Sequence, residues 1–171
     1  MSEVNVDTII SCGVAQSNHL RSCAAAAVKL QLKPHLVVWG DKPSEMTGNY
    51  LLDCLMGGEF SYYDASSIED MNCKMEEIAE EYVKQGRKPL VIPLGANMPL
   101  GVLGYFNAVK ELKTQLEEME FMPDYLVVTV GTASTYLGLM LGIRHYNLPI
   151  KLIGVTVISP DYDYMESLSQ G

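Results

Sequence analysis

The sequence predicts an α/β protein in which a parallel sheet is covered by helices on both faces, giving three layers. Short segments rich in β-branched and aromatic residues alternate along the chain with longer segments of helical periodicity. Such alternation is typical of parallel strands joined by right-handed crossovers. Hydrophobic residues make up 48% of the chain and charged residues 19%. This composition fits a sheet buried on both faces, or a part that packs against further chain.

Each predicted strand is short and is bounded by Gly, Pro or Asp. The predicted strands are Asp7–Ser11, His35–Trp39, Glu59–Tyr63, Pro89–Ile92, Tyr125–Thr129 and Lys151–Val157. The predicted helices are Asn18–Leu30, Asn49–Met56, Ile68–Gln85, Leu100–Met119 and Ser134–Tyr146. The third helix is clearly amphipathic, because apolar residues recur three or four positions apart at Met71, Met75, Ile78, Ala79 and Tyr82.

Polar or small residues follow three of the predicted strands. They are Gln16–His19 after the first strand, Gly95–Asn97 after the fourth and Gly131–Thr135 after the fifth. Open α/β sheets bind ligands beyond the carboxyl ends of their strands. We therefore expect all three segments to leave the same edge of a sheet, and the first and third to face one another across a cleft.

Gln16, Ser17 and Asn18 lie where the first strand gives way to a helix. The first N–H groups of a helix have no internal partner and carry partial positive charge, so a carboxylate or phosphate binds well there. The alternative is purely structural, because Ser and Asn are also preferred N-cap residues. The local sequence leaves both interpretations open.

The segment Gly131–Thr135 joins a strand to a helix in the same way. Its small residues let a ligand approach the backbone, and the hydroxyls of Thr132, Ser134 and Thr135 can donate to a phosphate. A Ser or Thr N-cap explains the pattern nearly as well. The segment has neither the phosphate loop of nucleoside triphosphatases nor the dinucleotide fingerprint.

Composition limits the other functions. The net charge of −9 argues against nucleic-acid binding, and the many glutamates of the third and fourth predicted helices are best interpreted as solvated faces. No histidine lies at metal-ligand spacing from these glutamates, so we expect no metal site.

The four cysteines show no zinc spacing, and Cys23 and Cys54 lie among apolar residues. His35 and His145 fit structural positions. With neither signal peptide nor membrane segment, we expect a cytoplasmic protein that binds no membrane.

Four segments, in order along the chain, resemble the D-cysteine desulfhydrase and 1-aminocyclopropane-1-carboxylate deaminase family. Gln16–Ala27 resembles the family's active-site segment, and Gly48–Gly58 its GN-x-LLD-x-LLGA helix. Ile92–Tyr105 resembles its IP-x-GGSN-x-LG-x-LGY turn, and Gly131–Leu139 its phosphate loop with the following helix. The resemblance implies a pyridoxal-phosphate enzyme of the tryptophan-synthase-β-like fold (fold type II), acting as a lyase or deaminase on a small amino acid.

The resemblance also implies roles for individual residues. Asn18 would bind the phenolic oxygen of pyridoxal 5′-phosphate, and Ser17 would be catalytic and meet the substrate carboxylate. Gln16 and His19 would line the carboxylate pocket, through side chain or backbone, although a solvent-facing His19 is an alternative. Histidine after the asparagine is typical of the desulfhydrase branch. The cofactor phosphate would be held by Gly131, Thr132, Ala133, Ser134 and Thr135, with Ser134 standing where glycine is more usual.

The resemblance divides the chain into a small domain, residues 1–98, and part of a large domain, residues 99–171, with the cofactor between them. It also implies a homo-oligomer. In the family the Schiff-base lysine precedes the Gln-Ser-Asn segment, whereas the first lysine here is Lys29 and only 16 residues precede Ser17. We therefore expect a central fragment of such an enzyme, inactive as a lyase by itself. A non-catalytic remnant that binds phosphate or pyridoxal phosphate weakly, or a fragment completed by a second chain, are the alternatives.

Overall fold

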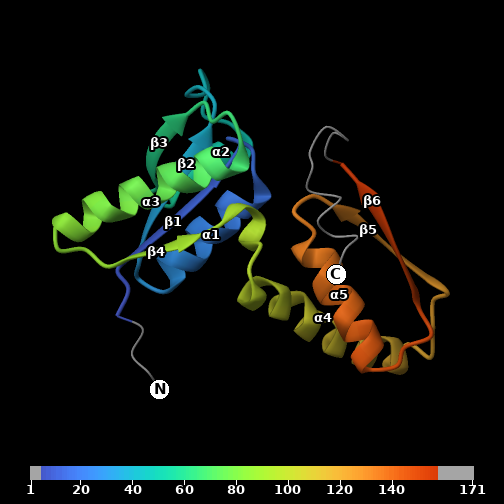
Figure 1. The fold of residues 1–171 in the computed structure, drawn as a ribbon. Coiled ribbons are helices and arrows are strands. Elements are labelled where there is room, and N and C mark those ends of the chain that lie inside the picture. Colours follow the sequence, from blue (N-terminus) through green and yellow to red (C-terminus); the bar gives the residue numbers. More distant parts are fainter. Residues whose placement is uncertain (1–4, 158–171) are drawn as a thin grey trace. The chain divides into compact units, whose positions relative to one another are not determined.

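The computed structural model describes residues 5–157, and strands alternate with helices along that range (Figure 1). Residues 1–4 lie outside the described range, and with them most of the N-terminal segment in which no signal peptide was recognised. The strands are β1 (Thr8–Gly13), β2 (Lys33–Trp39), β3 (Glu59–Tyr63), β4 (Pro89–Ile92), β5 (Tyr125–Val130) and β6 (Lys151–Thr156). The helices are α1 (Asn18–Lys29), α2 (Gly48–Leu55), α3 (Ile68–Lys84), α4 (Pro99–Glu118) and α5 (Ser134–His145), with a 3-10 turn η1 (Leu94–Ala96). Every predicted strand and helix is present, and the largest shifts of an end are two residues, as at β1.

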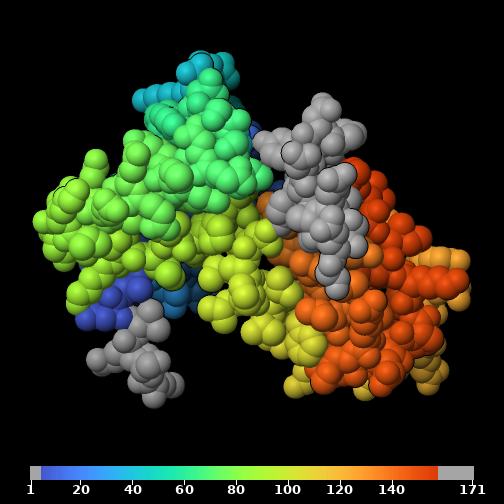
Figure 2. All heavy atoms as spheres, in the orientation of Figure 1, coloured from blue at the N-terminus to red at the C-terminus, as the bar shows by residue number. Residues whose placement is uncertain are grey.

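The chain divides into two compact units, Met1–Leu94 and Gly95–Gly171. The first unit contains a four-stranded sheet in the order β3-β2-β1-β4, and every pairing in it is parallel. Helix α1 lies on one face of this sheet and α3 on the other, which gives the predicted three layers (Figure 1). In the space-filling view the green atoms of the segment that contains α3 lie at the front of the first unit (Figure 2). The α/β fold class with parallel strands is confirmed.

The core of the first unit follows the two-residue period of its strands. On β2, Leu36 and Val38 pack with Leu20 and Ala24 of α1, whereas Val37 between them belongs to the cluster on the α3 face. That second cluster contains the apolar stripe of α3 that the sequence predicts, including Met71, Met75, Ile78 and Ala79. The alternation explains why the central strands are apolar at nearly every position, since both faces are covered.

The second unit is built from a helix pair and a two-stranded sheet. Strands β5 and β6 pair in parallel, with Tyr125 opposite Lys151 and Val130 opposite Thr156. Helix α5 packs on the sheet and on α4, and the core between them includes Val109, Leu116, Ile143 and Ile150.

The prediction that all three site segments leave one sheet edge is wrong for Gly131–Thr135. That segment follows β5, which belongs to the second sheet, whereas Gln16–His19 and Gly95–Asn97 follow strands of the first. Hydrophobic periodicity indicates where strands are, but it does not say which strands pair. That Gln16–His19 and Gly131–Thr135 face one another across a cleft stays a prediction.

One face of the β5–β6 sheet is exposed and apolar. Tyr125 and Val127 of β5 and Ile153 and Val155 of β6 are between 42% and 62% exposed, and the register places Val127 opposite Ile153. Parallel sheets are normally covered on both faces. We therefore expect a polypeptide of these 171 residues to self-associate through this face at micromolar concentration, because apolar contact outweighs the screened repulsion of its net charge.

The double variant Val127→Lys, Ile153→Glu tests this expectation. It should lower the weight-average mass measured by sedimentation, while Leu30→Lys, a change at an exposed residue at the end of α1, should not. A wild-type chain that sediments as a monomer over the whole micromolar range would contradict the expectation.

Candidate functional site

Ser17 is the N-cap of α1. Its Oγ accepts hydrogen bonds from the backbone N–H groups of His19 at 3.1 Å and Leu20 at 3.3 Å. The capping alternative is therefore realised in the structure. A serine hydroxyl that accepts two bonds still carries its own hydrogen, so the cap leaves Ser17 able to donate to a ligand.

Gly13 makes room for this cap. A Cβ atom at Gly13 would lie 2.9 Å from Ser17 Oγ and 3.2 Å from Leu20 Cγ, both too close for an ordinary contact. Gly13, the last residue of β1, is therefore part of the site, although no role for it was predicted from the sequence. The only signal for it in the sequence is a glycine at a strand end, which many turns share.

Gln16 uses its side chain to hold the start of α2. Its Oε1 accepts from the backbone N–H of Asn49 at 2.9 Å, and its Nε2 donates to the carbonyl of Thr47 at 3.1 Å. Thr47, the N-cap residue of α2, provides no side-chain cap itself, so Gln16 supplies one from 31 residues away. Gly48 has a φ of 54°, and a Cβ there would lie 2.4 Å from Gln16 Oε1. The side chain of Gln16 is thus occupied within the first unit.

Asn18 is the first residue of α1 and is exposed. Its Oδ1 accepts from Asn49 Nδ2 at 3.0 Å, and the same Nδ2 lies 2.9 Å from the backbone oxygen of Gln16. Asn49 therefore bridges two of the residues singled out from the sequence. It was missed there, because nothing in a sequence shows that residues 18 and 49 meet.

The imidazole of His19 turns toward β1 and is half-buried, contrary to a solvent-facing position. Its Nε2 lies 2.8 Å from Ser11 Oγ, and Ser11 donates its hydroxyl hydrogen to the carbonyl of Ile92, also at 2.8 Å. Ser11 Oγ must then accept from His19, which places a proton on Nε2. Burial lowers the pKa of the His19 imidazole, so the ring is neutral at pH 7. Ser11 was not predicted as a site residue, because the sequence marks it only as part of a strand.

Asp53 is a buried carboxylate between the helices of this region. It lies on α2, is 1% exposed, and its Oδ1 has no hydrogen-bond partner among the described residues. Burial raises the pKa of the Asp53 carboxyl to about 6, and the nearby charge of Arg21 opposes that rise. The buried thiol of Cys23, on α1, lies 3.6 Å from His19 Nε2. No pattern in the sequence indicated a function for Asp53.

The segment Gly131–Thr135 leads into the N-terminus of α5. The N-cap of α5 is Ala133, in the left-handed region with a φ of 67°, and its side chain has no atom that could accept from the helix. Ser134 is buried, and its Oγ donates to Asn97 Oδ1 at 3.4 Å. Thr132 packs closely against Gly95, where a Cβ would lie 2.1 Å from Thr132 Oγ1. The two predicted segments of this unit, 95–97 and 131–135, therefore meet.

The donor set at α5 fits a phosphate. The N-cap residue Ala133 offers no acceptor to the first N–H groups of the helix, and the helix dipole favours an anion at that end. The helices α1 and α3 differ, because their N-cap residues Ser17 and Ser67 accept from the helix, and α3 also carries Glu69 and Asp70 in its first turn. The sequence suggested a Ser or Thr N-cap at both candidate segments, and only α1 has one at its N-cap position.

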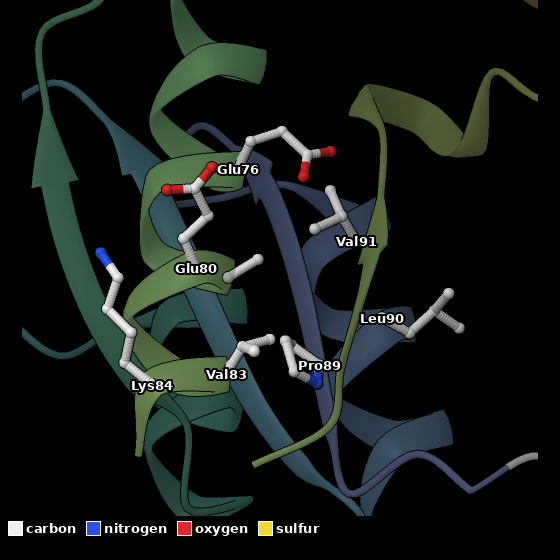
Figure 3. Close-up of a pocket in the computed structure, with 8 residues that line it drawn as sticks. Glu76, Glu80, Val83, Lys84, Pro89, Leu90 and Val91 are labelled. Carbon is white, nitrogen blue, oxygen red and sulfur yellow. The ribbon is translucent and has the colours of Figure 1, made fainter. Parts of the chain in front are cut away.

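A groove elsewhere on the first unit has no comparable donor set. It lies between α3 and the edge strand β4, with Ala79, Val83 and Leu90 among the apolar residues and Glu76 and Glu80 along one side (Figure 3). Its residues from β4 are Pro89–Val91, and none of the residues of the three predicted site segments lines it. The groove therefore does not belong to the candidate site.

The remaining expectations concern metals, membranes and histidines. Within residues 5–157, no group of His, Cys, Asp and Glu is suited to hold a metal ion, and no helix is long and apolar enough to span a bilayer. His35 is bonded to Tyr82 and Ser61, and His145 packs against Phe106 and Tyr146. Both contacts fit structural roles. Cys23 is buried, whereas Cys54 is only partly buried.

Comparison with known proteins extends these observations. A family model described as "Pyridoxal-phosphate dependent enzyme" matches residues 3–167. A protein of Pyrococcus abyssi, named "Putative 1-aminocyclopropane-1-carboxylate deaminase", is 40% identical over 153 residues, which are 90% of this chain and 46% of that protein. A D-cysteine desulfhydrase of Salmonella newport is 37% identical over 158 residues, which are 88% of this chain and 47% of that protein.

A crystal structure of a homologue of ACC deaminase superposes with a TM-score of 0.86 at 40% identity. The match covers 96% of this chain and 49% of the other. The chain therefore spans about half the length of the relatives it matches. The match to the family model, over residues 3–167, extends over both compact units.

Proposed function

Because the chain belongs to the family of pyridoxal-phosphate-dependent enzymes, we propose that it provides the cofactor and substrate site of a lyase or deaminase. The substrate is a small amino acid of the D-cysteine or 1-aminocyclopropane-1-carboxylate kind. These two follow from the names of relatives at about 40% identity. The observation that carries the proposal is the N-terminus of α5 behind Gly131–Thr135, where the N-cap residue is an alanine and backbone N–H groups offer the kind of donor that a cofactor phosphate requires.

In this proposal the second unit holds the phosphate. The donors are the N–H groups at the start of α5, including that of Ser134, and the hydroxyls of Thr132 and Thr135, while Gly131 and Ala133 keep the approach open. The close contact between Gly95 and Thr132 fixes the loop from the other side. Asn97 accepts from Ser134 and so holds that hydroxyl in place.

The first unit contributes Ser17 and Asn18. When bound, pyridoxal 5′-phosphate supplies an electron sink for a substrate carbanion. Asn18 donates from its amide to the phenolic oxygen, and Ser17 donates its hydroxyl hydrogen to the substrate carboxylate, which makes Ser17 the proposed catalytic residue. Gln16 and His19 line the carboxylate pocket in this proposal. The side chain of Gln16 holds α2, and His19 supports Ser17, because its backbone N–H donates to Ser17 Oγ while its ring is bonded to Ser11.

A phosphate titration of the 171-residue chain followed by NMR tests the proposed function. The backbone amides of Gly131–Thr135 should shift first and saturate together, with weak affinity, because a helix terminus and a few neutral donors each contribute about 1 kcal/mol. Thr135→Ala should weaken the affinity about fivefold. Thr114→Ala, which removes an exposed hydroxyl on α4, should leave it unchanged.

The amides at the start of α3 serve as an internal control. That helix is capped by Ser67 and begins with two carboxylates, so phosphate should not shift its first turn. Equal shifts at both helices, or shifts centred away from Gly131–Thr135, would contradict the proposed phosphate site.

A further inference from the structure

We propose that Asn49 is a positioning residue that orients the side-chain amide of Asn18, so that Asn18 presents its Nδ2 donor to the phenolic oxygen of the cofactor. The inference rests on the proposed function, in which Asn18 binds that oxygen. Asn49 itself touches neither cofactor nor substrate in this account, and it acts only through Asn18.

The hydrogen bonds fix which way each amide points. The backbone oxygen of Gln16 can only accept, so the Asn49 atom 2.9 Å away from it must be the nitrogen, Nδ2. That nitrogen also lies 3.0 Å from the side chain of Asn18, and the partner atom must then be an acceptor, Oδ1. The oxygen of the Asn18 amide is thereby committed to Asn49, and its nitrogen is the atom left for a ligand.

Asn49 is itself held firmly. Its backbone N–H donates to Gln16 Oε1, while Gln16 Nε2 donates to Thr47. Together with the two bonds from Asn49 Nδ2, these four hydrogen bonds link residues 16–18 to residues 47–49. Gly48 permits the close approach, because any larger residue there would collide with the side chain of Gln16. The start of α2 thus forms a rigid support for the start of α1.

The orientation of Asn18 has a chemical consequence. A donor facing the phenolic oxygen stabilises its ionised form, whereas an amide oxygen facing it stabilises the protonated form. An unsupported asparagine can present either atom, since the two ends of the amide have similar size. The hydrogen bond from Asn49 fixes the orientation of the Asn18 amide before the ligand binds.

The first experiment needs no ligand. The 15N relaxation of the Asn18 side-chain amide is measured in the full 171-residue chain, in the wild type and in Asn49→Ala. We expect an ordered amide in the wild type and a flexible one in the variant, with an order parameter falling below about 0.6. Asn107→Ala, at an exposed position on α4, is the control and should leave Asn18 ordered. An unchanged order parameter in Asn49→Ala would overturn the inference.

The second experiment determines which atom of the Asn18 side-chain amide faces the ligand. The probe is 4′-deoxypyridoxine 5′-phosphate, which keeps the phosphate and the phenolic hydroxyl and needs no lysine because it has no aldehyde. Asn49→Ala should bind it several-fold more weakly than the wild type. In Asn49→Asp the carboxylate attracts Asn18 Nδ2, so Asn18 turns over and its oxygen faces the probe. The absorption of the bound probe should then change from the phenolate form toward the protonated phenol.

The aspartate variant separates positioning from stability. An acidic residue in the first turn favours a helix, and α2 has none in its first turn. This gain offsets part of the loss of the hydrogen bond to the Gln16 carbonyl, and thermal unfolding measured beside the spectrum shows whether Asn49→Asp stays folded. Wild-type binding with an unchanged spectrum in Asn49→Asp would overturn the inference. A wild type that does not bind the probe would count against the proposed function, and the ordering of Asn18 would still decide the role of Asn49.

Discussion

Replacing Gly138 with alanine should destabilise the second unit by about 3 kcal/mol, at the upper end of the usual effect of overpacking. Gly138 lies on α5 where that helix meets α4. A Cβ at this position would lie 2.5 Å from the backbone oxygen of Val102 and 2.6 Å from Tyr105 Cβ. Neither atom can move without moving α4, so the two helices must separate and the core around Val109 and Ile143 must loosen.

Gly104→Ala is the matched control. Gly104 is also a helical glycine, on α4, but a Cβ there meets no atom within 4 Å. The same substitution should stabilise the unit by about 0.5–1 kcal/mol, because alanine restricts the unfolded chain and favours the helix. Urea unfolding followed by circular dichroism measures both variants. Equal effects of the two substitutions would show that the contact between α4 and α5 is looser than the structure indicates.

The elements of this fold could be predicted from the sequence because periodicity is a local property. The stripe of Met71, Met75 and Ile78 identifies α3 and its buried face, and β-branched runs bounded by Gly or Pro identify the strands. The pairing of strands is not local. Strands β4 and β5 are separated by the long helix α4 and belong to different sheets, and no pattern within either strand reveals this.

The candidate site divides in the same way. Ser17 and Asn18 could be found because helix N-termini have a recognisable sequence, and so could Gly131–Thr135. The residues that support them could not, since the pairs Asn18–Asn49 and Ser11–Ile92 are 31 and 81 residues apart in the chain. Nor could the sequence show that the N-cap of α1 is Ser17 whereas the N-cap of α5 is Ala133, because both segments contain suitable hydroxyls.

Replacing Asp53 with asparagine should stabilise the protein at neutral and alkaline pH. The carboxyl has a pKa of about 6 in the folded protein against 3.8 for the ordinary group, so the folded state binds the proton more tightly than the unfolded state. The stability contributed by protonated Asp53 is therefore complete below about pH 4 and is lost as the pH rises through 6. Above that, a buried carboxylate with an unpartnered Oδ1 costs about 3 kcal/mol.

The measurement is the difference in free energy of unfolding between Asp53→Asn and the wild type. It should shift in favour of the variant by about 2 kcal/mol between about pH 4 and about pH 7.5, because asparagine does not titrate. Taking the difference cancels the contributions of all other titrating groups that the substitution leaves alone.

Asp70→Asn provides a control of opposite sign. Hydrogen bonds from the backbone and side chain of Ser66 and from Tyr63 lower the pKa of the Asp70 carboxyl, so its contribution to stability is present at neutral pH and is lost on acidification. Asp70→Asn should therefore destabilise the protein at neutral pH and much less in acid. If Asp53→Asn showed no dependence on pH, or the same sign as Asp70→Asn, then Asp53 would be solvated or paired in solution, and the contact between α1 and α2 would be more open than the structure shows.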